Sequence, residues 1–326
     1  MPSLDEIKSS LRDATDDYEQ TVIALLALSQ HLKYEHSANS WFGRKFKTSE
    51  KNMVSPNTDI TPDLTTQINK NYGIITEARK NFARAEDYDD KITQIKKYDD
   101  ELKGWETQDG LIQNNDLVIL THLLEVRGIE DHLKERLSEF TGKRKIIILG
   151  FIRDNEKDVS VVIRREGSET FSEGVGEKLR RGVAIKYEHL LNFGLSTIKF
   201  YDANPPLPYL LEIIWDNILS EKPTEEEYRT NGKKKIEIIT NVDEIVTELK
   251  RFAPEQNGNR LPEIPKRSWV ETALEKLVEI KLAKKIRKED RHGTYKISFR
   301  RKLGKGENSL EIFIDLIAKT MQQTRL

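Results

Sequence analysis

The sequence predicts an α/β fold with a mixed β-sheet flanked by helices, followed by a smaller domain of helices and strands. Three observations support this prediction. The chain opens with apolar residues at helical spacing, and short runs of β-formers then alternate with helical segments to about residue 165. Last, three prolines fall within residues 205–208, where neither a helix nor a central strand can continue. We therefore expect two domains, 1–203 and 204–326.

The elements expected in the first domain follow from these patterns in order. Apolar residues at helical spacing predict a helix over 3–34, and the polar segment 35–57 predicts a loop that carries basic contacts. Runs of β-formers, alternating with amphipathic stretches, predict strands at 59–68, 72–79, 117–122, 145–151 and 158–165, and helices at 88–105 and 129–140. The result is a mixed sheet with helices on its faces.

The second domain shows a different order of elements. We expect helices at 209–219, 242–252, 268–281 and 309–321, and strands at 235–240, 282–290 and 293–301. Helices followed by a basic two-stranded hairpin are the arrangement of a winged helix. The sequence therefore predicts a winged-helix-like domain over 204–326.

Composition excludes several classes of site. The chain has 326 residues with 54 basic and 55 acidic side chains, so its net charge does not indicate a nucleic-acid partner. There is no cysteine, which excludes disulfides, thiolate zinc sites and cysteine nucleophiles. The six histidines form no HxxxH or HxH spacing. With no apolar secretion signal or membrane-length segment, we expect a cytoplasmic protein.

Two acidic residues occupy neighbouring predicted strands. Asp63 follows Pro62, and Glu77 lies near the end of the next strand, with Arg79 two residues later. Because strand side chains alternate, Glu77 and Arg79 point the same way and Lys80 points the other way. Two carboxylates and a cation in one pocket suit phosphodiester cleavage, in which a divalent ion polarises the phosphate and activates water. Mg²⁺ is the expected ion, and Mn²⁺ can substitute.

This arrangement resembles the PD-(D/E)xK, or restriction-endonuclease-like, nuclease superfamily over residues 15–165. Gln94 and Tyr98, one turn apart on the next helix, are similar to the QxxxY motif of its RecB-like branch. The resemblance implies that Asp63 and Glu77 bind metal, that Gln94 and Tyr98 assist, and that a glutamate of the first helix, Glu19 by position, also contributes.

The sequence departs from that pattern at Arg79, where the family has lysine. Arginine clamps phosphate but does not share a proton with an attacking water. Three alternatives remain open: arginine stabilises the transition state, Lys80 or another lysine replaces the missing group, or the core binds DNA without cutting it.

A local excess of positive charge marks the C-terminal domain. Residues 260–305 hold 15 basic and six acidic side chains, a formal charge of +9, and such clusters bind nucleic-acid backbones. On the first domain, Lys96 and Lys97 lie on an exposed helix face. We expect the remaining DNA contacts at the start of the recognition helix and on the wing, from Lys266, Arg267, Ser268, Arg287, Lys288, Arg291 and His292.

These observations predict a Mg²⁺-dependent DNA endonuclease that acts on double-stranded DNA, in restriction or defence against foreign DNA. A homodimer is expected for a double-strand cutter. The alternative is a non-catalytic DNA-binding protein, a regulator or recognition subunit with a degenerate nuclease core. A third interpretation is a scaffold that meets a protein partner through its acidic helices.

Overall fold

The chain divides into two compact units. The computed structural model describes residues 2–43, 46, 60–82, 84–107, 109–154, 160–192, 198–223, 236–253, 255–256, 259–260, 264–286, 293–300 and 308–324. The sheet unit comprises Glu19–Ala203 with Pro254–Leu261, and the C-terminal unit comprises Met1–Tyr18, Asn204–Ala253 and Pro262–Leu326. The chain thus passes from one unit to the other at 203–204, within the proline-rich stretch, but residues 1–18 group with the C-terminal residues.

The first helix, α1 (Leu4–His36), contributes to both units. Within the C-terminal unit, Lys8 and Arg12 pair with Asp315 and Glu311 of α9 (Ser309–Thr324) at 2.5 and 2.6 Å. Within the sheet unit, residues 22–28 of α1 are buried on every side. A domain boundary predicted from the proline-rich linker does not reveal that α1 contributes to both units. The contacts responsible join the first residues of the chain to the last helix.

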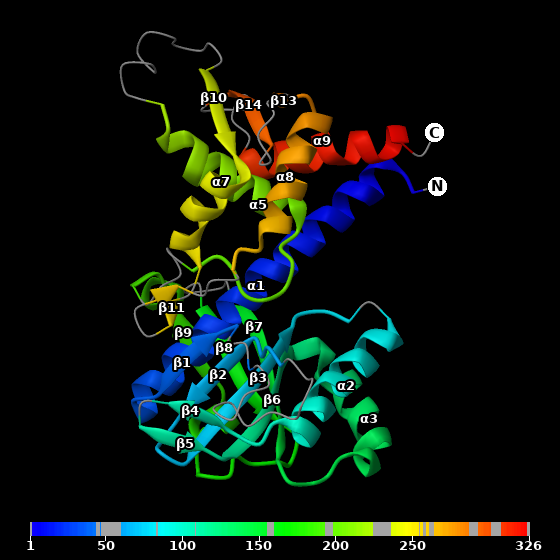
Figure 1. Ribbon diagram of the computed structural model, residues 1–326. Helices are drawn as coiled ribbons and strands as arrows, with labels where there is room; N and C mark the ends of the chain where they lie inside the picture. Colours follow the sequence, from blue (N-terminus) through cyan, green and yellow to red (C-terminus); the bar gives the residue numbers. More distant parts are fainter. Residues whose placement is uncertain are drawn as a thin grey trace. The chain divides into compact units, whose positions relative to one another are not determined.

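The sheet unit is built on a seven-stranded mixed sheet (Figure 1) with the order β1-β2-β3-β6-β7-β8-β9. The strands are β1 (Asn39–Phe42), β2 (Leu64–Gln67), β3 (Tyr72–Arg79), β6 (Asn114–His122), β7 (Ile146–Asp154), β8 (Ser160–Glu166) and β9 (Val183–Lys186). Neighbouring strands are antiparallel except for the pairs β3–β6 and β6–β7. The predicted α/β fold, with a mixed sheet and flanking helices, is confirmed at this level.

The two parallel pairs require crossover connections, and helices supply them. α2 (Ala85–Glu101) connects β3 to β6, and α3 (Val126–Arg136) connects β6 to β7. The two helices lie side by side in Figure 1 and contact each other. Apolar side chains from both helices pack with those of β3, β6 and β7 into one buried core. This packing determines which face of α2 meets the sheet.

Three parts of the sheet unit differ from the sequence-based expectation. Residues 39–42, expected in a loop, form the edge strand β1, because they pair with β2 over four residues. The helix expected to reach residue 105 ends at Glu101, since Gly104 has a φ of 149° and Trp105 starts the hairpin β4 (Trp105–Thr107) and β5 (Gly110–Ile112). Strand β9 was not expected. Short strands of this kind depend on a partner strand more than on their own composition.

The C-terminal unit pairs helices with a three-stranded antiparallel sheet. Its elements are α5 (Leu207–Ile213), which continues as short π and 3₁₀ turns to Glu221, then β10 (Ile236–Asn241), α7 (Val242–Leu249), α8 (Arg267–Glu279), β13 (Ala283–Ile286), β14 (Thr294–Phe299) and α9. The sheet order is β10-β14-β13. Trp215 packs against Phe299 and Phe313, with ring centroids 5.1 and 5.7 Å apart, at the centre of this unit.

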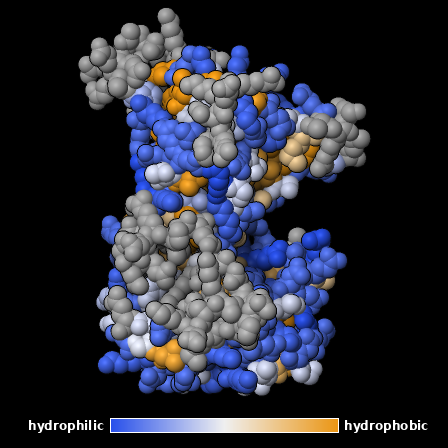
Figure 2. All heavy atoms as spheres, in the orientation of Figure 1, coloured by the Kyte–Doolittle hydropathy of each residue, from blue (hydrophilic) through white to orange (hydrophobic). Residues whose placement is uncertain are grey.

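The face of the molecule shown in Figure 2 is mostly polar. Outside the grey atoms, hydrophobic residues form only small separate patches on the face shown in Figure 2. Among the described helices, none combines the length and the apolar character needed to cross a bilayer.

Gly73 offers a test of the packing that positions β3. A Cβ at this position would lie 2.6 Å from the indole of Trp105 and 2.8 Å from the carbonyl oxygen of Thr66. Trp105 is fully buried, so it has little room to move. We expect Gly73→Ala to destabilise the protein by about 1–3 kcal/mol, measured as a lower melting temperature. An unchanged melting temperature would contradict this packing.

Candidate active site

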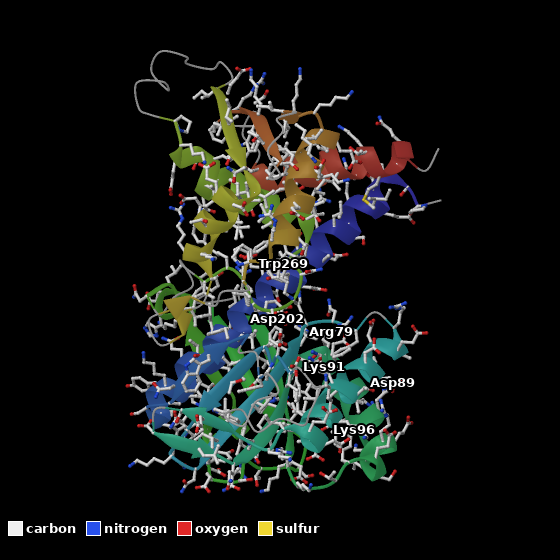
Figure 3. The ribbon with its side chains drawn as sticks, in the orientation of Figure 1. Arg79, Asp89, Lys91, Lys96, Asp202 and Trp269 are labelled. Carbon is white, nitrogen blue, oxygen red and sulfur yellow. The ribbon has the colours of Figure 1, made fainter. Side chains whose placement is uncertain are left out.

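A cavity of about 340 Å³ lies at the end of the sheet where β2 and β3 meet α2. Its charged lining side chains are four acids and two bases: Asp63, Glu77, Asp90, Asp202, Arg79 and Lys91. All belong to the sheet unit. Figure 3 shows Arg79, Lys91 and Asp202 near one another at this end. The excess of carboxylates over cations favours a divalent cation in the cavity.

Asp63 and Glu77 come together as the sequence predicts. Leu64 pairs with Thr76 in the antiparallel β2–β3 register, which brings Asp63, one residue earlier, beside Glu77. Asp63 Oδ2 accepts a hydrogen bond of 2.8 Å from the backbone N–H of Ala78, so β3 holds both carboxylates. The two residues are only 7% and 1% exposed. Both acids therefore meet inside the protein rather than on its surface.

The two carboxylates repel each other. Burial raises the pKa of Asp63 well above its ordinary value, and the neighbouring charge of Glu77 raises it further. Without a bound cation, Asp63 therefore holds a proton more readily than an exposed aspartate. A divalent ion would favour the ionised form and displace that proton.

The structure adds a residue that the sequence analysis did not select, Lys91 of α2. Its Nζ donates to Glu77 Oε2 at 2.9 Å and to Gln94 Oε1 at 3.1 Å, and the side chain is buried. Burial by itself would lower the pKa of Lys91, but the charges of Glu77 and Asp63 raise it, so the ammonium stays protonated. Lys91 precedes Gln94 by three residues and shares its helix face. That spacing is the signal that could have identified it.

Gln94 and Tyr98 join the same cluster. The Tyr98 hydroxyl donates a short hydrogen bond to Glu77 Oε1, and Gln94 Nε2 donates to the Tyr98 oxygen at 3.1 Å. Burial, followed by the charge of Glu77, raises the pKa of Tyr98, so the phenol remains a proton donor. Both oxygens of Glu77 therefore have donors from one face of α2. The structure brings the QxxxY residues to the acids.

Arg79 lines the cavity but does not replace the lysine of the family pattern. Its Nε donates to the carbonyl oxygen of Asn81 at 3.0 Å, and its Nη2 donates to Asp87 Oδ1 at 2.9 Å. The guanidinium is thus held by Asp87 and Asn81, whereas Lys91 is the cation bonded to Glu77. Arg79 lies on the cavity side of β3, as strand alternation predicts. Its long side chain bonds to Asp87 and Asn81 at the rim of the cavity.

Two other predicted residues do not reach the cavity. Lys80 is half-buried at the end of β3, and its carbonyl oxygen accepts from the backbone N–H of His122. Glu19 is an exposed residue of α1 whose charge acts on Tyr187. Neither side chain is among those that line the cavity. Glu19 therefore lies apart from the residues that line the cavity, and its contribution to a metal site stays a prediction.

The donor set fits one hard divalent ion. Within the described ranges, no three His, Cys, Asp or Glu side chains are close enough to share a metal. Mg²⁺ commonly uses only one or two protein carboxylates and takes water and phosphate oxygens for its other positions. The buried, mutually repelling carboxylates of Asp63 and Glu77 match that requirement.

The predicted DNA-contacting residues divide into three groups. Arg287, Lys288, Arg291 and His292 lie outside the described residues. Lys96, which pairs with Asp100 at 2.6 Å, and the exposed Lys97 lie on α2. At the start of α8, Lys266 lies over the ring of Trp269 at 5.3 Å, Arg267 pairs with Asp243 and Glu271, and Ser268 is exposed.

The exposed face of α8 is acidic. Glu271, Glu275 and Glu279 follow one another at four-residue spacing and are exposed. The neighbouring cations pair with them, including Lys285 with Glu275 at 2.5 Å and Lys276 with Glu279 at 2.5 Å. The positive charge counted along residues 260–305 is therefore partly neutralised on this helix, which does not offer a basic surface to DNA.

Comparisons with protein-family models, with curated proteins and with solved structures find no match for this chain. The functional interpretation therefore depends on the chemistry of the cavity.

The raised pKa of Asp63 predicts a pH-dependent stability. The folded protein holds this proton more tightly than the unfolded chain, so stability falls as pH rises above the ordinary value of 3.8 towards the raised pKa. Asparagine cannot ionise and can still accept from Ala78. In EDTA at neutral pH, we therefore expect Asp63→Asn to be more stable than the wild type and to melt at a higher temperature.

The measurement is a thermal melt of the full chain at a series of pH values. The stability difference between Asp63→Asn and the wild type should disappear as the pH falls to the ordinary pKa of aspartate. At that pH, residue 63 is uncharged in both folded proteins. Addition of Mg²⁺ should raise the melting temperature of the wild type and leave that of Asp63→Asn unchanged. A variant that melts below the wild type at neutral pH would contradict the charge repulsion.

Proposed function

We propose that this protein is a Mg²⁺-dependent deoxyribonuclease that hydrolyses phosphodiester bonds of double-stranded DNA. The observation that carries the proposal is that Asp63, directly before β2, meets Glu77 of β3 and Lys91 of α2 in one cavity. Two carboxylates for a hard cation and one ammonium for a phosphate are the groups that this reaction needs. A role in defence against foreign DNA follows from the family resemblance.

Each residue of the cluster has a distinct role in this proposal. Asp63 and Glu77 would hold the ion, which when bound polarises the phosphate and lowers the pKa of a water molecule. Lys91 supplies the protonated cation that Arg79 does not bring to the carboxylates, and it donates to the negatively charged phosphate. Gln94 and Tyr98 orient Lys91 and Glu77 through hydrogen bonds.

The order of elements supports the assignment. A helix, three antiparallel strands, a helix and a parallel strand follow one another as α1, β1, β2, β3, α2 and β6. This order places Asp63 directly before β2 and Glu77 on β3, so that both acids reach the cavity beside α2. The short hairpin β4–β5 lies between α2 and β6 as an addition.

We infer that the C-terminal unit is a winged helix from the order of its elements. α5, β10, α7 and α8 precede the hairpin β13–β14, and β14 lies between the other two strands. We propose that this unit binds DNA mainly through basic residues that lie between β13 and β14 in the sequence, Arg287, Lys288, Arg291 and His292, because α8 presents exposed glutamates. DNA binding without cleavage would support the alternative, a regulator or recognition subunit with an inactive core.

The direct test is cleavage of plasmid DNA. We expect the wild type to cut in Mg²⁺ or Mn²⁺ and to be inactive in EDTA. Asp63→Asn and Glu77→Gln should each lower the rate by roughly 10²–10⁴-fold, because each removes a carboxylate from the ion. Equal cleavage by all three proteins would remove the assigned site, and salt-sensitive binding without any cleavage would identify the inactive core.

Lys91 distinguishes this cluster from the family pattern. We expect Lys91→Met to reduce kcat by about 10²–10³-fold, because Lys91 is the one cation among the described residues that bonds to Glu77. Lys91→Arg should retain part of the activity if charge alone is needed. Lys103→Met, at an exposed lysine just after α2, is the matched control and should cut at the wild-type rate. Full activity in Lys91→Met would exclude this role.

A further inference from the structure

We propose that Arg79 binds a backbone phosphate of the DNA at the rim of the cavity, and that Asp87 is the positioning residue that orients it. This inference rests on the proposed function. It assigns Arg79 to substrate binding and leaves the chemistry to the carboxylates and Lys91.

Three contacts hold the guanidinium in one place. Asp87 Oδ1 accepts from Nη2 at 2.9 Å, the carbonyl oxygen of Asn81 accepts from Nε at 3.0 Å, and the ring of Phe82 lies under the guanidinium carbon at 5.3 Å. An arginine held in this way gives up less conformational entropy when it binds a ligand.

Asp87 is itself held firmly. Its side chain is 7% exposed, and its Oδ2 accepts from the backbone N–H of Arg84 at 2.9 Å in the capping box that opens α2. Burial acts against its charge, but the bond from Arg84 and the charge of Arg79 hold the pKa of Asp87 below its ordinary value. Asp87 is therefore a charged, immobile partner that links the first turn of α2 to the end of β3.

Phe82 is the first ring of a stack that reaches α3. Phe82 and Tyr88 lie parallel with centroids 4.3 Å apart, and Tyr88 and His132 lie parallel at 4.7 Å. The Tyr88 hydroxyl donates to Glu125, and Gly128 leaves the space that the Tyr88 ring fills, since a Cβ there would lie 2.7 Å from the hydroxyl. The ring stack that begins under Arg79 therefore contacts both crossover helices, α2 and α3.

The rest of the guanidinium remains available to a ligand. An arginine carries five N–H donors, and the contacts of Arg79 within the described residues use the Nε and one Nη2 hydrogen. The side chain is 38% exposed and lines the same cavity as Asp63 and Glu77. A flat, charged donor group at the rim of such a cavity matches the geometry of a phosphate.

Arginine and lysine then act on different parts of the substrate. Among the described contacts, Arg79 bonds to neither Asp63 nor Glu77, so in this proposal it contributes equally to binding of the ground state and of the transition state. Loss of such a contact raises KM and leaves kcat unchanged, whereas loss of a transition-state contact lowers kcat. A purely structural ion pair would change neither the affinity for DNA nor its dependence on salt.

The experiment measures steady-state cleavage and, in EDTA, the salt dependence of binding to a fluorescent duplex. Arg79→Ala should raise KM by about 10- to 100-fold with kcat within about twofold of the wild type. The slope of log Kd against log salt should become smaller by roughly 0.9, the value for one lost phosphate contact. Arg79→Lys should keep the salt slope and raise KM severalfold, because it keeps the charge but loses the two-donor geometry.

Asp87→Asn tests the positioning role, because it keeps an oxygen for the Arg84 N–H and removes the charge that orients Arg79. It should raise KM less than Arg79→Ala does, and the double variant should bind no worse than Arg79→Ala alone. Arg84→Ala is the matched control. Arg84 is 71% exposed, lies 3.8 Å from the same Asp87 and does not line the cavity, so its removal should leave KM and the salt slope unchanged.

The results separate this inference from the proposed function. A wild type that cuts DNA, together with an Arg79→Ala variant of unchanged KM and salt slope, overturns the inference alone. So does a fall in kcat at unchanged KM, which would assign Arg79 to the transition state. A wild type that neither cuts nor binds the duplex overturns both.

Discussion

The contact between Glu77 and Lys91 is the interaction on which the rest of the cavity depends. Two carboxylates, Asp63 and Glu77, lie side by side in the interior, and such a pair is unfavourable unless a positive charge compensates for it. Lys91 provides that charge in the structure. Protonation of Asp63 or a divalent ion provides the remainder. If the proposed divalent ion binds here, it would compete with the proton of Asp63, and its binding would depend on pH.

Helix α2 carries most of this machinery. Its inner face presents Lys91, Gln94 and Tyr98 to Glu77, and its first turn presents Asp87 to Arg79. The helix is also the crossover that makes β3 and β6 parallel, so its position on the sheet is determined by the fold. A single rigid element therefore sets the geometry of the carboxylate cluster and of the cation at the rim.

The two cations of the cavity occupy different environments. Lys91 is buried against a carboxylate, whereas Arg79 stands at the partly exposed rim between an acid and an aromatic ring. Lysine is a compact charge on a flexible stem, and arginine is a planar group that suits stacking and two-donor contacts. Each residue type thus stands where its chemistry fits. In the nuclease that we propose, Lys91 of α2 supplies the cation at the carboxylates, and Arg79 at the end of β3 is left for another role.

The sequence by itself determined the features that depend on local pattern. Runs of β-formers indicated the strand pair next to Asp63 and Glu77, and period-two alternation placed Glu77 and Arg79 on the same side. One-turn spacing indicated the shared face of Gln94 and Tyr98. The tertiary structure alone decided that Lys91 reaches Glu77, since this depends on how α2 crosses the sheet. It also decided that residues 1–18 group with the C-terminal residues, that 39–42 form an edge strand and that α8 exposes glutamates. Such contacts join segments that are far apart in the sequence, and a contact of this kind produces no periodic pattern from which it could be predicted.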